Sequence, residues 1–149
     1  MARTTSDIVI DAPANRIMTV IADFAAYPSW ATGVQIADIL GIDADGRAEK
    51  VHFVLNSPPI RDEYVLDYTW DGDRNVSWAL DEPGSMLKAL DGTYVLEEIA
   101  ANETRVTYQL AVDVSIPLLG MLKRKAEKII VDTALKGLKS KVESDSNGG

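Results

Sequence analysis

The stretch EYVLDYTW, residues 63–70, places a large apolar or aromatic side chain at every second position: Tyr64, Leu66, Tyr68 and Trp70. A period of two is typical of a β-strand with one buried face. The turn signal Asp71-Gly72-Asp73 follows directly, and residues 76–80 then repeat the alternation. The centre of the chain therefore predicts two antiparallel strands joined by a tight turn.

The same period of two recurs on both sides of this hairpin, interrupted by short segments rich in Gly, Asp, Asn and Pro. Because these links are short, consecutive strands should pair antiparallel. The apolar face of a sheet of about seven strands needs a covering layer. In addition to the two central strands, we predict strands over residues 3–10, 33–42, 47–55, 90–96 and 106–114.

Helix signals flank the strands. Pro13 is a favourable first residue for a helix over residues 13–22, and residues 23–30 predict a second short helix or a bend. The C-terminal segment carries apolar residues at spacings of three and four from Pro117 to about Lys141, a helix of roughly 37 Å. We expect Leu122, Ala126, Ile129 and Thr133 to face the sheet, and Lys125, Lys128 and Lys136 to face water.

The order of these elements predicts an α+β fold. A strongly curved, seven-stranded antiparallel sheet would wrap around the long C-terminal helix, with two short helices after the first strand. The length of 149 residues fits one domain, which we assign to residues 1–143. The polar segment 144–149 is predicted to be a disordered tail.

Composition excludes several classes of site. The net charge of −8 argues against nucleic-acid binding, which needs a cationic surface. The chain has no cysteine and a single histidine, His52, so we predict neither a metal site nor a cofactor. The N-terminal residues do not resemble a signal peptide, and no stretch of about 20 apolar residues is present, so we expect a cytoplasmic protein.

The predicted C-terminal helix is basic, with seven basic and two acidic side chains over residues 117–141. One interpretation is a solvated outer face that complements an acidic sheet. The other is transient contact with an anionic membrane surface during loading of a lipid. We expect a monomer or a weak dimer.

Several stretches resemble a known superfamily. Residues 8–13, IVIDAP, match an opening strand with an Ala-Pro helix start, and residues 21–30 match a block that ends in Tyr-Pro-x-Trp. Residues 90–96 and 103–108 resemble paired late strands. On these grounds the chain resembles the START-related SRPBCC superfamily, and within it the bacterial polyketide cyclase/dehydrase and lipid-transport group. The resemblance implies the helix-grip fold; members include carriers of apolar ligands, coenzyme Q-binding proteins and aromatase/cyclases.

A set of aromatic side chains shares the face that should lie beneath the helix. Each buried hydroxyl or indole N–H needs a hydrogen-bond partner, which water or a ligand in a cavity would supply. We therefore predict a cavity of a few hundred Å³, the usual size of a small-ligand site. An ordinary aromatic core is the alternative. The predicted ligand-binding residues are Tyr64, Leu66, Tyr68, Trp78, Tyr94, Tyr108, Leu110, Leu122 and Ile129.

Two functions are compatible with the sequence. The one that we predict is binding of an apolar or aromatic small molecule, such as a lipid or a polyketide. The second is a cofactor-independent cyclase/dehydrase, in which Tyr, Asp, Glu or Arg groups catalyse enolisation, aldol closure or dehydration. Residues 61–63, Arg-Asp-Glu, are candidates for such groups, but we favour the interpretation that they form a solvated strand edge. His52 lies between Val51 and Phe53 on the predicted strand, so it should point to the opposite face, toward solvent. We therefore assign no catalytic residue.

Overall fold

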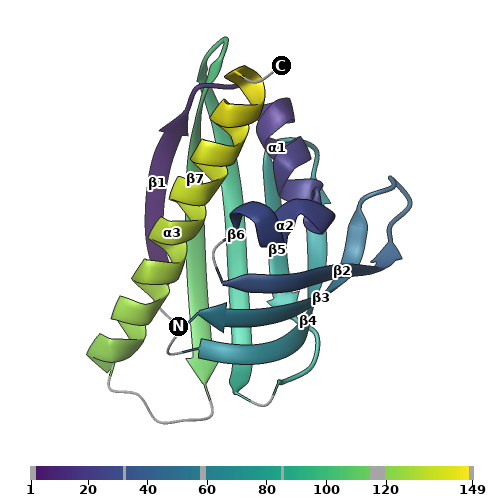
Figure 1. Cartoon of the computed structure of the whole chain (residues 1–149), viewed down its shortest axis with the longest axis vertical. Helices are drawn as coiled ribbons and strands as arrows, with labels where there is room; N and C mark the ends of the chain where they lie inside the picture. Colours follow the sequence, from purple (N-terminus) through teal and green to yellow (C-terminus); the bar gives the residue numbers. More distant parts are fainter. Residues whose placement is uncertain (1–2, 32, 58–59, 85, 115–119, 148–149) are drawn as a thin grey trace.

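One antiparallel sheet of seven strands, in the order β1-β7-β6-β5-β4-β3-β2, makes up most of the described chain. The computed structural model describes residues 3–31, 33–57, 60–84, 86–114 and 120–147 (Figure 1). Every neighbouring pair of these strands is antiparallel, as predicted. The strands are β1 Thr4–Ile10, β2 Val34–Ile42, β3 Ala48–Ser57, β4 Ile60–Asp71, β5 Asn75–Leu80, β6 Leu87–Ala100 and β7 Glu103–Val114.

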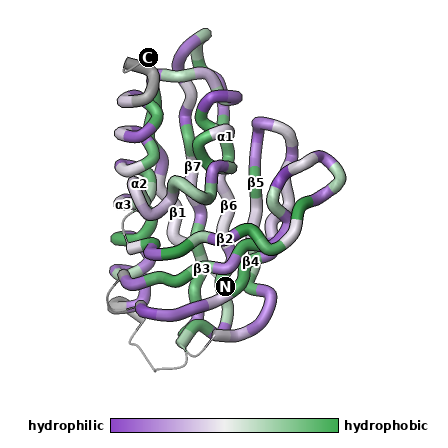
Figure 2. The backbone as a smooth tube through the Cα atoms, turned by 45° about the vertical axis from the view of Figure 1, so that its right-hand side comes forward, coloured by the Kyte–Doolittle hydropathy of each residue, from purple (hydrophilic) through white to green (hydrophobic). Residues whose placement is uncertain are grey.

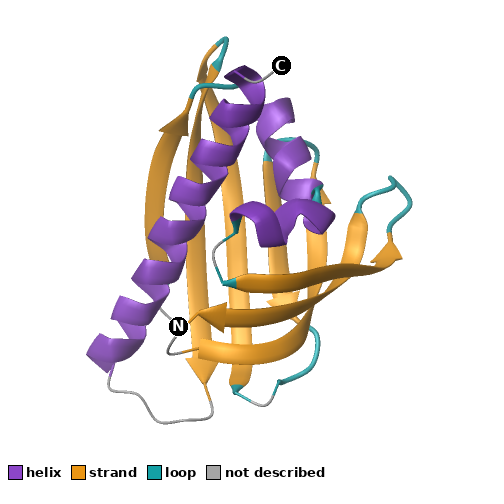
Figure 3. Cartoon of the chain, in the orientation of Figure 1, coloured by secondary structure: helices purple, strands orange, loops and turns teal. Residues whose placement is uncertain are grey.

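The helices lie on the concave side of the curved sheet (Figures 1 and 3). The long α3 runs along β1 and β7, α1 packs beside it, and α2 contacts β2. The tube in Figure 2 changes repeatedly between hydrophobic and hydrophilic along the strands and α3, as expected of elements with one buried face. The helical elements are α1 Ala14–Ala22, the 3₁₀ turn η1 Phe24–Ala26, α2 Tyr27–Trp30 and α3 Gly120–Asn147.

The C-terminal helix is longer than predicted. It continues to Asn147 instead of ending near Lys141 and so extends into the segment 144–149, whose assignment as a disordered tail stays a prediction. Val142 is fully buried, and the Lys139 ammonium lies 2.6 Å from a Glu143 carboxylate oxygen one turn along. These contacts hold the last turns in place. The predicted start at Pro117 lies outside the described residues.

The buried face of α3 also differs from the prediction. Lys125, Lys128 and Lys136 are exposed as expected, and Ala126 is buried. Ile129, however, is 48% exposed, so the expectation that it faces the sheet was wrong. Residues 129–131 are all β-branched and apolar, and consecutive residues on a helix point about 100° apart, so only part of this run can face inward. The fully or almost fully buried residues are Val131, Leu135, Leu138 and Val142.

This assignment can be tested with two adjacent substitutions. Ile129→Ala should change the free energy of unfolding by no more than about 0.5 kcal/mol, because the side chain is largely in water. Val131→Ala should cost about 2 kcal/mol, because two fully buried methyl groups are removed. Urea unfolding followed by circular dichroism measures both values. Equal losses would show that α3 is rotated relative to the described helix.

A buried carboxylate fixes α3 to the sheet. Glu127 is only 3% exposed; one oxygen accepts a hydrogen bond from the Thr4 hydroxyl at 2.8 Å and the other from the Val112 backbone N–H at 2.7 Å. Two basic side chains of the helix are paired locally, Lys128 with Asp132 and Lys139 with Glu143. Part of the positive charge of α3 is therefore neutralised within the helix, which supports the solvated-face interpretation.

Candidate functional site

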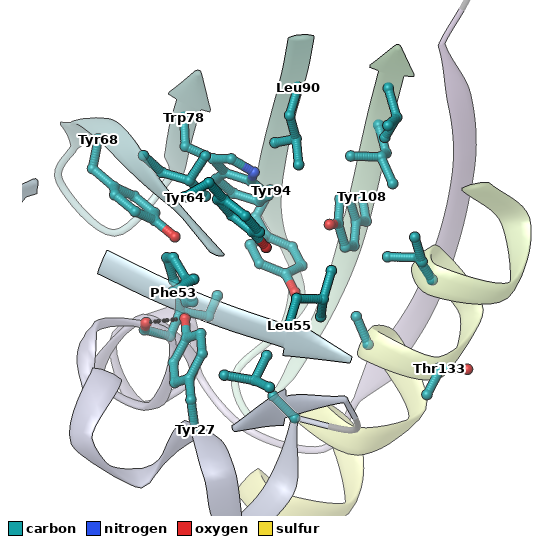
Figure 4. Close-up of a pocket in the computed structure, with 18 of the residues that line it drawn as sticks. Tyr27, Phe53, Leu55, Tyr64, Tyr68, Trp78, Leu90, Tyr94, Tyr108 and Thr133 are labelled. Atoms are coloured by element: carbon teal, nitrogen blue, oxygen red, sulfur yellow. Dashed lines mark hydrogen bonds between the residues drawn. The ribbon is translucent and has the colours of Figure 1, made fainter. Parts of the chain in front are cut away.

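A cavity of about 120 Å³ lies between the concave face of the sheet, α2 and α3 (Figure 4). Strands β3 to β7 supply most of its wall, and three residues of α3 complete it: Ile130, Thr133 and Ala134. The remaining wall residues are Ile21, Tyr27, Trp30, Ala31, Val34, Phe53, Leu55, Tyr64, Leu66, Tyr68, Trp78, Leu87, Leu90, Tyr94, Tyr108, Leu110 and Val112.

The cavity is smaller than the few hundred Å³ that we predicted. An engineered protein cavity of about 150 Å³ holds one benzene molecule, so about 120 Å³ corresponds to a ligand with one small ring system. Aromatic side chains occupy the remaining space beneath the helix. The Tyr94 and Tyr108 rings lie 4.7 Å apart, and the Trp78 and Tyr94 rings 5.2 Å apart, between centroids. A larger ligand would have to displace some of these rings.

Trp78 on β5 is the centre of the aromatic wall. Its ring contacts those of Tyr68, Tyr94 and Tyr108 at centroid distances of 5.7, 5.2 and 5.6 Å. Gly92 is its cross-strand partner on β6, and a Cβ added there would lie 2.3 Å from the indole. The indole thus lies flat over a residue without a side chain. Sequence reasoning missed this role of Gly92, although a glycine within a strand often marks such a close approach.

Four tyrosine side chains line the cavity with their hydroxyls toward it, and no hydrogen bond joins these hydroxyls to another described residue: those of Tyr64, Tyr68, Tyr94 and Tyr108. The Tyr27 hydroxyl, by contrast, donates to the backbone carbonyl of Ile21, which is the dashed line in Figure 4. Burial raises the pKa of all these hydroxyls, and neighbouring tyrosines raise the pKa of Tyr64, Tyr68 and Tyr94 further. At neutral pH they are uncharged groups that can donate and accept hydrogen bonds.

The candidate acid and base groups do not line the cavity. Asp62 is 6% exposed, and one of its oxygens accepts the backbone N–H groups of Met86 and Leu87 at 3.0 and 2.7 Å. It holds the start of β6 against β4, a role that sequence reasoning did not foresee. His52 lies 2.8 Å from Glu63 across β3 and β4, on the face opposite to the buried Val51 and Phe53, as predicted.

The structure brings most of the predicted site residues together. Leu122 has a side chain outside the described part of the structure. Ile129 points away from the cavity, so its expected place in the wall was wrong, and its neighbour Ile130 lines the cavity instead. Whether the wall binds a ligand stays a prediction. The predicted residues that line the cavity are Tyr64, Leu66, Tyr68, Trp78, Tyr94, Tyr108 and Leu110.

Among the described residues, no group of three or more His, Asp or Glu side chains is placed to hold a metal ion. In the same part of the chain, no helix is both long and apolar enough to cross a membrane.

Fold and cavity together define a helix-grip domain, in which a curved sheet and a long helix enclose an apolar space. Comparison with protein families gives the same result, because the family model described as "Polyketide cyclase / dehydrase and lipid transport" matches residues 1–143. The chain belongs to this family. No curated protein sequence matches it significantly.

Solved structures with the same fold share little sequence with this chain. A START superfamily protein from Mycobacterium smegmatis superposes with a TM-score of 0.89 at 19% identity, covering 97% of this chain and 99% of that one. The ZhuI aromatase/cyclase from Streptomyces sp. R1128 gives 0.81 at 13% identity, covering 97% and 94%. A protein from Thermus thermophilus gives 0.79 at 21% identity, covering 97% and 99%.

Proposed function

We propose that this protein binds an uncharged small molecule containing at least one ring in the cavity beneath α3. The observation that supports this best is the set of four tyrosine hydroxyls that face an apolar space and are bonded to no other described residue. A buried hydroxyl without a partner costs roughly 1–3 kcal/mol. A ligand, or water in its absence, would supply the missing hydrogen bonds, and the flat aromatic wall suits a ring.

The chemistry of the wall favours an uncharged ligand. Every residue that lines the cavity is apolar, aromatic or, at Thr133, a hydroxyl; none carries a charge. Burial of an ionised carboxylate without a paired cation is strongly unfavourable. A fatty acid with its carboxylate inside the cavity would therefore bind poorly, whereas a ring with a few oxygen atoms would be accommodated.

A cyclase/dehydrase reaction is the second candidate, favoured by the family and by the likeness to an aromatase/cyclase. Proton abstraction needs a base whose pKa lies near the working pH. Burial moves the pKa of the tyrosine hydroxyls upward, away from that range. These hydroxyls could polarise a ligand carbonyl by donating a hydrogen bond, but the lining residues offer no base. Binding is therefore the better supported function.

Binding can be tested with 1-indanone, a small uncharged ketone. In nuclear magnetic resonance titrations of the whole protein, signals of cavity residues should shift in a saturable way. Ala134→Leu fills the cavity from α3, so it should weaken binding at least tenfold without lowering the melting temperature. Ile129→Ala, on the outer face of the same helix, is the matched control and should bind as the parent protein does. If the parent protein shows no saturable shifts, the aromatic wall is an ordinary core and the proposal fails.

A further inference from the structure

The three tryptophans of the chain differ in what their indole N–H groups contact. Trp70 donates to the backbone carbonyl of Ala48 at 2.7 Å. The nitrogen of Trp30 is enclosed by protein atoms and has no hydrogen-bond partner among the described residues. Trp78 lines the cavity, and no hydrogen bond joins its nitrogen, which faces the cavity in Figure 4, to another described residue. Within the described structure, Trp78 therefore presents a free donor to the cavity.

The orientation of this donor is fixed by the packing around it. The Trp78 indole packs closely over Gly92. A Cβ added to Gly92 would lie 2.4 Å from the indole Nε1. Tyr68, Tyr94 and Tyr108 contact the ring as well. Rotation of the ring would collide with these neighbours, because protein interiors are close-packed. The packing therefore fixes the direction in which the Trp78 N–H points.

An indole differs from the surrounding phenols in one chemical respect. A tyrosine hydroxyl can donate or accept a hydrogen bond, so it adapts to either kind of ligand group. The indole nitrogen can only donate. Of the polar groups in this part of the wall, Trp78 is therefore the one that distinguishes an acceptor on the ligand from a donor.

We infer that Trp78, held in place over Gly92, selects ring ligands that carry an acceptor oxygen, such as a ring ketone, over the corresponding hydrocarbons. This inference rests on the proposed binding function and specifies the ligand for it. A hydrocarbon in the cavity would leave the buried N–H unpaired, whereas a carbonyl oxygen would satisfy it. A site built to bond a polar group rejects the analogue that lacks it.

The test compares 1-indanone with indane, which have the same ring system and differ by one carbonyl group. We expect 1-indanone to bind about five- to tenfold more tightly, the effect of one net hydrogen bond. Trp78→Phe keeps an aromatic ring and removes the donor, so it should abolish most of this preference. Trp70→Phe removes an indole N–H that is already bonded to Ala48, and should leave the preference unchanged while lowering stability.

A direct readout comes from the three indole N–H signals in ¹H–¹⁵N spectra of the parent protein, assigned with the Phe variants. The Trp78 proton should move downfield with 1-indanone and not with indane. Any of three results would overturn the inference and leave the binding function standing. The two compounds could bind with equal affinity, folded Trp78→Phe could keep the preference for the ketone, or the Trp78 signal could stay in place when 1-indanone is added. If Trp78→Phe does not fold, the parent spectrum decides. Failure of both compounds to bind would instead reject the proposed function.

Discussion

The folded protein should lose stability steeply as the pH rises above about 10, well before its tyrosines ionise in the native state. All five tyrosines have a pKa raised above the ordinary value, with burial as the largest cause at each. In the unfolded chain they ionise near pH 10. Above that pH the unfolded state has lost protons that the folded state still holds, so the free energy of unfolding falls as pH rises.

The expected slope is large. Each shifted group costs about 1.4 kcal/mol per pH unit between its unfolded and folded pKa, so five groups cost about 7 kcal/mol per unit. Because a domain has a stability of about 5–15 kcal/mol, one to two pH units should suffice to unfold it. Below about pH 10 this contribution is fully present and should not vary with pH.

The measurement is a pH titration that follows tyrosinate absorbance and circular dichroism on the same samples. Both signals should stay constant through pH 10 and then change together in one cooperative transition. Tyr108→Phe removes one of the titrating groups and should make the dependence of stability on pH shallower by about a fifth. A gradual rise of tyrosinate absorbance near pH 10, with circular dichroism unchanged, would contradict the burial of these rings.

The sheet could be predicted because its signals are local and redundant. An alternating strand such as β4 has only one register that buries Tyr64, Leu66 and Tyr68 together, since a slip of one residue would turn all three to water. The tight turn after β4 could also be predicted, because Asp71-Gly72-Asp73 is a turn signal. In the structure Gly72 has a positive φ of 55° there. The alternation along the strands alone therefore predicted that the aromatic side chains lie on the concave face.

The errors concern features that depend on distant contacts. On α3, residues 129–131 are all apolar, so the sequence pattern alone does not reveal which of them faces the sheet. Asp62 and Glu127 read as surface charges, yet each is buried because backbone N–H groups far along the chain bond to it. The cavity volume depends on how the aromatic rings tilt, which a pattern of residue types does not specify.

Gly92→Ala, directly beneath the cavity-lining Trp78, should be a strongly damaging single-methyl change. The added Cβ would lie 2.3–2.5 Å from three atoms of the Trp78 indole, far inside van der Waals contact, so the ring must move into the cavity. Overpacking of this kind typically lowers the free energy of unfolding by about 1–3 kcal/mol, and we expect a loss at the upper end of this range. The displaced ring should also fill part of the 120 Å³ and weaken 1-indanone binding at least tenfold.

A double-mutant cycle separates this collision from a general effect on β6. Trp78→Leu removes the indole atoms that the new methyl group meets, so in that background Gly92→Ala should cost less than about 1 kcal/mol in urea unfolding. Conversion to alanine removes only backbone freedom, and Gly92 has no positive φ that alanine would strain. If Gly92→Ala costs the same with and without the indole, the loss arises in the strand itself. The close contact between Trp78 and Gly92, on which the orientation of the donor depends, would then be absent from the protein in solution.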